Sequence, residues 1–296
     1  MKLSQALLIG TLGIISACSS TQGPSAGNQM GNLILAEPAK ADMRVQMAVA
    51  RLTEILNRAD IPEPQKAELY YQRGVYYDSV GLNGMAMYDF TRAVRLNPKL
   101  AEAYNFLGIH YTQQQEFVEA YTYFDSALEI DPEHAYAFLN RGIALYYGGR
   151  ADQALKDFDL FYQQDHSDPY RVLWHYMADS HMDPVNAKQT LRNQRAQLDN
   201  SNWATHLVDF YLGDVSESQL LNLLTEGLAN QQQLNNRLCE AYFYLGKYFA
   251  DAGAQGKASN YFKAALSTNV YDFVEHRYAR LELDLMRERS IPDLHK

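Results

Sequence analysis

The chain repeats itself at an interval of 34 residues, and this repeat constrains its fold more than any other feature. A glycine, an alanine and a phenylalanine recur at the same spacing in three consecutive copies. These positions are Gly74, Ala86 and Phe90, then Gly108, Ala120 and Phe124, then Gly142, Ala154 and Phe158, with Pro98 and Pro132 closing the first two copies. Repeats of this length are typical of two antiparallel helices that bury their apolar faces against neighbouring units. The sequence therefore predicts an all-α helical solenoid.

Each recurring residue has a structural reason. A glycine and an alanine let two helices approach closely, the phenylalanine fills the space between them, and a proline ends the second helix. The pattern resembles the tetratricopeptide repeat, whose aromatic position in the first helix is matched by Tyr70, Tyr104 and Phe138. A fourth copy follows at Tyr242, Gly246, Ala258 and Phe262, with Val270 in the place of the proline. Stacked repeats of this kind usually bind partner proteins.

Residues 169–238 keep a helical pattern but lose the repeat. If the interval continued, its glycine, alanine and phenylalanine positions would fall on Tyr176, Lys188 and Arg192. Asp183-Pro184 predicts a break between helices, and Ser216 with Gln219 predicts a capping box that opens another helix. We expect two or three helix pairs here that continue the stack.

The N-terminus predicts export and lipidation. Lys2 precedes an apolar run over residues 7–15, which is too short to span a bilayer and suits a signal peptide. The run ends in Ile15-Ser16-Ala17-Cys18, which resembles the bacterial lipobox. That resemblance implies a mature N-terminus at Cys18 with three acyl chains, and Ser19 after it implies the outer membrane, facing the periplasm. The alternative is an ordinary secretory signal with an incidental cysteine.

These patterns divide the chain into seven predicted parts. They are a signal peptide (1–17), a lipidated N-terminus and flexible tether (18–41), an N-terminal helix region (42–66), three tetratricopeptide repeats (67–168), divergent helical repeats (169–238), a fourth clear repeat (239–272) and a C-terminal capping helix with a tail (273–296).

Composition and motifs argue against several functions. The net charge of −9 disfavours a nucleic-acid partner. After lipidation only Cys239 remains, so no intramolecular disulfide can form, and we expect Cys239 to be a small buried residue. The eight histidines show no metal-ligand spacing, and Asp165, His166, Ser167 and Asp168 are contiguous, which is unsuited to a catalytic triad. The sequence predicts no catalytic residue, no metal site and no cofactor.

Three longer segments carry a more specific resemblance. Residues 141–150, 244–248 and above all 269–279 (NVYDFVEHRYA) resemble the NlpI-type outer-membrane lipoproteins. This resemblance implies a homodimeric adaptor that brings a tail-specific periplasmic protease of the Prc type to its substrates, notably peptidoglycan endopeptidases, and that scaffolds cell-wall hydrolases. Two alternatives are an assembly lipoprotein, such as a pilus pilotin or an outer-membrane-protein assembly subunit, and an enzyme in its own right.

Candidate contact residues follow from the repeat geometry, because first helices line the concave face of such a stack. The outward positions are Tyr71, Val75, Asp78, Asn105, Ile109, Thr112, Leu139, Ile143, Tyr146 and Tyr147. We predict a partner-binding groove there.

The two ends of the stack also carry predictions. Met43, Met47, Ala50 and Ile55 form an apolar spacing for capping or self-association, and the family resemblance favours dimerisation. The run from Phe273 to Tyr278 predicts a cap on the last repeat, with Glu275 and Arg277 as alternative contacts for a partner.

Overall fold

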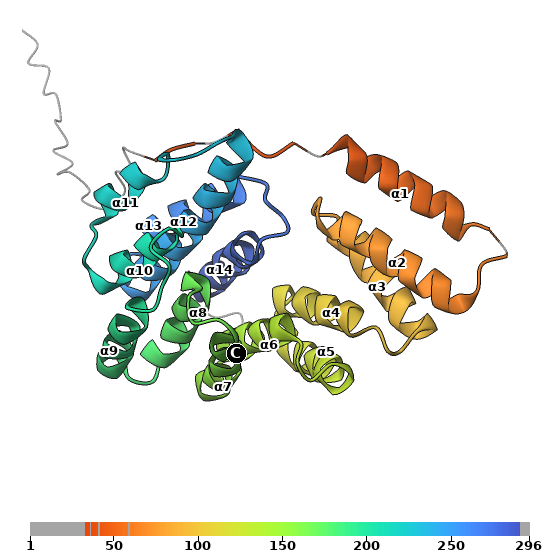
Figure 1. Cartoon of the computed structure of the whole chain (residues 1–296), viewed down its shortest axis with the longest axis horizontal. Helices are drawn as coiled ribbons and strands as arrows, with labels where there is room; N and C mark the ends of the chain where they lie inside the picture. The colour runs from red at the N-terminus through yellow and green to blue at the C-terminus, as the bar shows by residue number, and fades with distance from the viewer. Residues whose placement is uncertain (1–32, 36, 41, 59, 291–296) are drawn as a thin grey trace, which may run out of the picture.

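A computed structural model describes residues 33–35, 37–40, 42–58 and 60–290 of the chain. Within these residues there are fourteen α-helices and no β-strand, so the predicted all-α class is confirmed. The helices of the first half are α1 (Met43–Leu56), α2 (Glu63–Asp78), α3 (Asn83–Leu96), α4 (Ala101–Gln113), α5 (Phe117–Ile130), α6 (Ala135–Tyr147) and α7 (Ala151–Gln164). Figure 1 shows them as an arc that leads into the second half of the chain.

The second half continues the arc and then turns inward. Its helices are α8 (Pro169–Ser180), α9 (Pro184–Arg195), α10 (Thr205–Leu212), α11 (Glu217–Leu223), α12 (Gln231–Asp251), α13 (Gln255–Leu266) and α14 (Val274–Ser290). α14 lies on the inner side of the arc, against α12, α13 and α4 (Figure 1). The largest hydrophobic core extends from α6 to α14, and smaller clusters connect the repeats between α2 and α6.

The repeat glycines hold the helix pairs together as predicted. A Cβ atom placed on Gly108 or Gly142 would lie 2.6 Å from the ring of Phe124 or Phe158 in the same repeat. The fourth copy has the same contact, 2.5 Å from Gly246 to Phe262. Since real Cβ atoms do not approach so closely, only glycine permits this spacing between the two helices. The helix pairs α2–α3, α4–α5, α6–α7 and α12–α13 have the most extensive packing in the chain.

The helix boundaries follow local signals in the sequence. α9 begins at Pro184 with Asp183 as its N-cap, and the Ser216–Gln219 capping box at α11 is present in full. Gly149, just beyond α6, adopts a left-handed conformation (φ +75°), which glycine tolerates at the end of a helix. α12 begins at Gln231, ahead of residue 239 where the fourth repeat was predicted to start.

Part of the predicted tether packs against the helical body. The hydroxyl of Tyr242 accepts from the amide of Ile34 (3.0 Å) and donates to its carbonyl (2.6 Å). Asn235 donates to the carbonyl of Glu37 (2.9 Å), and the amide of Ala39 donates to the carbonyl of Thr268 (2.9 Å). Residues 33–35 and 37–40, which the sequence assigned to a flexible tether, thus contact α12 and the turn after α13 through the backbone groups of Ile34, Glu37 and Ala39. Cys18 lies outside the described residues.

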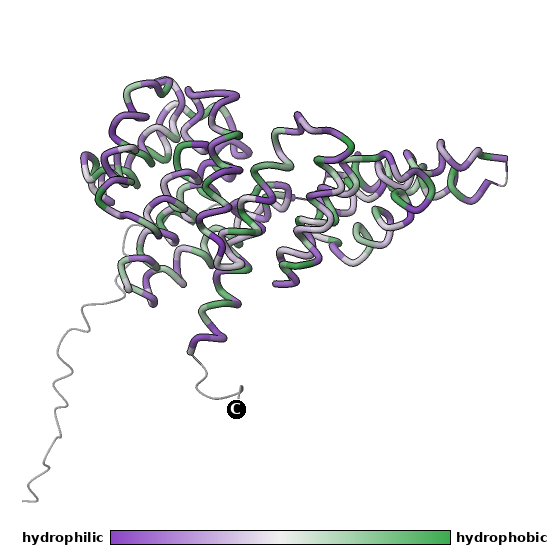
Figure 2. Tube along the Cα trace, turned by 90° about the horizontal axis from the view of Figure 1, so that it is seen from below, coloured by the Kyte–Doolittle hydropathy of each residue, from purple (hydrophilic) through white to green (hydrophobic). Residues whose placement is uncertain are grey.

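Hydropathy varies along each helix on the scale of a turn. Figure 2 shows hydrophilic and hydrophobic residues alternating along the trace, as expected where one side of a helix packs and the other meets water. None of the described helices combines the length and the apolar character that a membrane span requires.

Candidate functional site

The ten predicted groove residues share one face of the stack but are mostly covered. They lie on α2, α4 and α6, the first helices of the three clear repeats. Seven are buried, namely Asp78, Asn105, Ile109, Thr112, Leu139, Ile143 and Tyr146, and Tyr71, Val75 and Tyr147 are partly buried. The groove that the repeats predict is therefore already filled in part by the chain itself. Its main occupant is α14.

The first contact of α14 with the groove is an ion pair to the first repeat. The guanidinium of Arg277 donates to the carboxylate of Asp78, the last residue of α2, and only about a tenth or less of either side chain is exposed. Asp78 also lies 3.0 Å from Nε2 of His110 on α4. Arg277 and the buried Glu275 thus face the protein interior, and the alternative that these two charges are presented to a partner does not match their positions.

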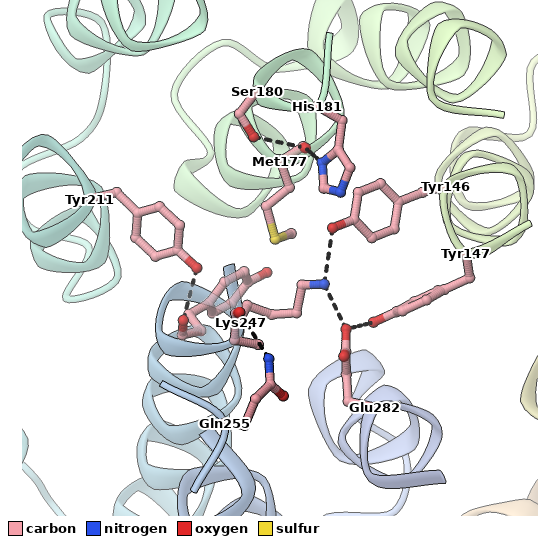
Figure 3. Close-up of polar contacts among 11 residues, drawn as sticks. Tyr146, Tyr147, Met177, Ser180, His181, Tyr211, Lys247, Gln255 and Glu282 are labelled. Carbon is pink, nitrogen blue, oxygen red and sulfur yellow. Dashed lines mark hydrogen bonds and ion pairs between the residues drawn. The ribbon is translucent and has the colours of Figure 1, made fainter. Parts of the chain in front are cut away.

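The second contact is a buried polar network at the centre of the arc (Figure 3). Lys247 on α12 donates to Glu282 on α14 (2.6 Å) and to the hydroxyl of Tyr146 on α6 (3.0 Å). The hydroxyl of Tyr147 donates to the same oxygen of Glu282 (2.9 Å). Three helices that are distant in the sequence are thereby joined through one carboxylate.

Lys247 and Glu282 form a charged pair inside the protein. Burial opposes the charge of Lys247, but Glu282, Tyr146 and Asp251 together outweigh it, and the pKa of Lys247 lies well above its ordinary value. Burial, together with the charge of Glu282, also raises the pKa of Tyr147 well above its ordinary value, so that its hydroxyl keeps the proton that it donates. Buried ions are retained only where each has a partner, and here both have one.

The third contact lies near the end of α14. Gln115, in the turn after α4, donates to the carboxylate of Glu288 (2.8 Å). α14 thus contacts the first repeat at Asp78, the second at Gln115 and the third at Tyr147. A helix lying along the inner face of repeats in this way occupies the place of a helical ligand.

The structure gives the Asp165–Asp168 segment a role in the turn between α7 and α8. The carboxylate of Asp165 accepts from the amide (2.9 Å) and the hydroxyl (2.7 Å) of Ser167. Asp168 is the N-cap of α8. Among the described residues, no group of three or more histidine, cysteine or acidic side chains is arranged to hold a metal ion.

Sequence reasoning did not find the pairing of Lys247 with Glu282. The available signal in the sequence was Lys247 itself, a lysine inside the aromatic run from Tyr242 to Phe249. In the structure this lysine is 3% exposed, and a charge buried so deeply needs a partner. Which residue supplies that partner depends on the path of α14, which no repeat pattern specifies. Cys239 is buried and free, as expected.

Comparison with known protein families matches one repeat of the chain. The tetratricopeptide repeat (TPR) family model matches residues 101–134. The chain is similar to YrrB, a TPR protein with an unusual peptide-binding site, at 16% identity over 83% of this chain and 100% of that one, with a TM-score of 0.41. A MamA structure (AMB-1) matches at 18% identity over 52% and 90% of the two chains, with a TM-score of 0.46.

A shorter match is the second TPR domain of human RPAP3 in complex with an HSP70 peptide. It has 20% identity over 40% of this chain and 95% of that one, with a TM-score of 0.36. At these identities the likeness concerns the fold alone. The repeat match at residues 101–134 and the glycine–phenylalanine contacts indicate an all-α solenoid built on tetratricopeptide repeats.

Proposed function

We propose that this protein is a non-catalytic adaptor of the bacterial outer membrane, which brings a tail-specific periplasmic protease and peptidoglycan endopeptidases together. Tetratricopeptide repeats are protein-interaction scaffolds, and the observation that carries the proposal is the inner face of the first three repeats. That face binds α14 of the same chain through the Arg277–Asp78 ion pair, the polar network around Glu282 and the hydrogen bond from Gln115 to Glu288. A surface with these properties suits a helical or extended segment of another protein.

The proposed location rests on the N-terminus. Lipidation of Cys18 would attach the protein to the outer membrane, on the periplasmic side. The described segment at residues 33–35 and 37–40 packs along α12, so the helical body begins near residue 33 rather than 42. At most fifteen residues then separate Cys18 from the body, a reach of about 50 Å when fully extended.

The identity of the partners rests on the resemblance of residues 269–279 to the NlpI-type lipoproteins. The structure gives this segment a defined place, since it carries Tyr271 and Arg277 to the end of α2. We propose a Prc-type protease as one partner and its endopeptidase substrates as the other, and regulation of cell-wall hydrolase turnover as the result.

We further propose that the protein is a homodimer through α1. Met43 and Met47 are 72% and 66% exposed, and they follow one another on the same face of the helix with Ala50. α1 packs on α2 through Leu52 and partly buried neighbours, which leaves the stripe of Met43, Met47 and Ala50 for a second copy. A Met47→Glu variant should sediment as a monomer, whereas Val185→Glu, at the start of α9 where the valine is 80% exposed, should leave the dimer intact.

The test of the adaptor function is a pull-down from periplasmic extract with residues 19–296, followed by a degradation assay. We expect recovery of a tail-specific protease and an endopeptidase, and faster degradation of the endopeptidase when the protein is added to the two. Recovery of pilus or porin-assembly proteins, with no effect on proteolysis, would contradict the proposal and favour an assembly lipoprotein. Cleavage by the purified protein alone would show an enzyme.

A further inference from the structure

An aromatic pocket opens beside the Lys247–Glu282 network, and none of the functions proposed above uses it. It has a volume of about 450 Å³ and lies between α8, the start of α9 and the C-terminal end of α12. Its walls include Tyr176, Ser180 and His181 from α8 and its C-cap, and Tyr248 and Asp251 from α12. A pocket of this size accommodates a long side chain.

The polar groups on the α8 wall present hydrogen-bond acceptors. Nδ1 of His181 lies 2.9 Å from the carbonyl of Met177, and the hydroxyl of Ser180 donates to the same carbonyl at 3.0 Å (Figure 3). A carbonyl only accepts, so Nδ1 must carry the proton of a neutral His181, and Nε2 then has a free lone pair. The Ser180 oxygen likewise keeps its acceptor capacity.

The α12 wall adds a negative charge and an aromatic surface. Asp251 forms no ion pair within the described part of the chain, and burial raises the pKa of its carboxyl above the ordinary value, so a cationic partner is needed to stabilise its charge. Lys247 is paired with Glu282, so Asp251 is the acidic group of this wall that keeps no salt-bridge partner among the described residues. Arg289, at the exposed end of α14, is not part of the pocket lining.

The tyrosine rings are held in place by other aromatic side chains. The ring centre of Tyr248 lies 4.6 Å from that of Phe210 and 5.4 Å from that of Tyr211, and Tyr176 makes an edge contact with Tyr211 at 5.7 Å. Tyr248 is 36% exposed and therefore offers surface to a ligand. Rings fixed in this way bind a flat cation with little loss of conformational entropy.

We propose that this pocket binds an arginine side chain presented by a partner polypeptide. A guanidinium has five N–H donors and no acceptor, stacks on tyrosine and pairs with a carboxylate in two hydrogen bonds. The N–H donors match the acceptors of His181 and Ser180, the flat guanidinium matches the ring of Tyr248, and its charge matches the carboxylate of Asp251. The proposal deepens the adaptor function, on which it rests, by giving the chemistry of one residue that the adaptor recognises.

The test uses the full-length protein and the probe acetyl-Gly-Arg-Gly-amide, with binding followed by NMR titration. The matched probe carries citrulline, which has the shape of arginine without its charge. We expect the arginine probe to bind at least 10-fold more tightly than citrulline, and Asp251→Asn to remove most of this difference. A lysine probe should bind more weakly, since an ammonium cannot stack or pair in two hydrogen bonds.

The control variant is Glu226→Gln, which removes an exposed carboxylate near the opposite end of α12 and should bind like the unaltered protein. Equal affinity for arginine and citrulline, unchanged binding in Asp251→Asn, or no binding of the arginine probe at millimolar concentration would each overturn the proposal. The pull-down separates the two proposals. If the unaltered protein recovers protease and endopeptidase while the arginine probe fails to bind to it, the adaptor function stands and the arginine pocket does not.

Discussion

Arg277 and Asp78 form an ion pair although 199 positions separate them in the sequence. The pair connects the first turn of α14 to the last residue of α2, and it places the C-terminal helix against the first repeat. Tyr271 packs on the turn that follows α2, since a Cβ on Gly81 in that turn would lie 2.7 Å from the Tyr271 ring. The two ends of the repeat stack therefore meet.

Replacing Arg277 by Met should leave the buried Asp78 without its main partner. Removing one member of a buried pair typically costs about 3 kcal/mol, so we expect a loss of this size in the free energy of unfolding, measured by urea denaturation. Arg287→Met on the same helix is the control, because Arg287 is exposed and its pair with Asp284 lies at the surface. Equal effects of the two substitutions would contradict a structural role for the Arg277 pair.

Gly142→Ala should destabilise the third repeat. The added methyl group would meet the Phe158 ring at 2.6 Å, and such overpacking typically costs about 2 kcal/mol. At Gly84 on α3, a Cβ meets nothing within 4 Å, so Gly84→Ala should instead stabilise the protein by up to about 1 kcal/mol through its higher helix propensity. Thermal unfolding of both variants checks the opposite signs.

Glu240 makes the stability depend on pH. Burial and the neighbouring Glu275 carboxyl raise the pKa of Glu240 from 4.5 to about 8. The folded state therefore binds more protons than the unfolded state, so this contribution to stability is complete below pH 4.5 and is lost as the pH rises through 8. We expect the free energy of unfolding to fall between pH 6 and pH 9.

Glu240→Gln should flatten this dependence and give the more stable protein at pH 9. Glutamine stays neutral and its oxygen still accepts from Nε1 of Trp203, which lies 2.9 Å from the Glu240 carboxylate. Urea denaturation at several pH values measures the slope, and the exposed Glu226→Gln is the control. Parallel slopes for the Glu240 variant and the unaltered protein would show that Glu240 does not titrate in this range.

Tyr242→Phe should release the segment before α1. It removes one hydroxyl and with it both hydrogen bonds to Ile34, so amide exchange at Ile34 should become faster. The free energy of unfolding should fall by only about 1 kcal/mol, because the segment is short. Tyr88→Phe, at a tyrosine that is 58% exposed, should change neither quantity.

The sequence predicted those features that depend on residues close together in the chain. The repeat glycines and phenylalanines, the break before Pro184 and the capping box at Ser216 act within one or two helices, and each is where it was expected. These contacts join residues within one helix pair, and the spacing of those residues in the sequence is enough to predict them.

Two features could not be predicted in the same way. The path of α14 across the groove depends on single pairs, such as Lys247 with Glu282, that no periodicity specifies. The segment before α1 is bound mainly through its backbone, at Ile34, Glu37 and Ala39, and backbone groups are the same for almost every residue. The groove residues were placed on the correct helices, but their burial was not foreseen, because it depends on the neighbouring repeats and, at Asp78 and Tyr147, on α14.

The meeting of α2 with α14 changes how such a molecule should unfold. An open stack of repeats loses its end units first, because each unit depends only on its neighbours. Here the first repeat is also held by the last helix, so neither end can separate without breaking the Arg277–Asp78 pair and exposing Tyr271. We therefore expect the terminal repeats to share one cooperative transition, and a truncation that removes α14 to weaken the N-terminal repeats as well as the C-terminal ones.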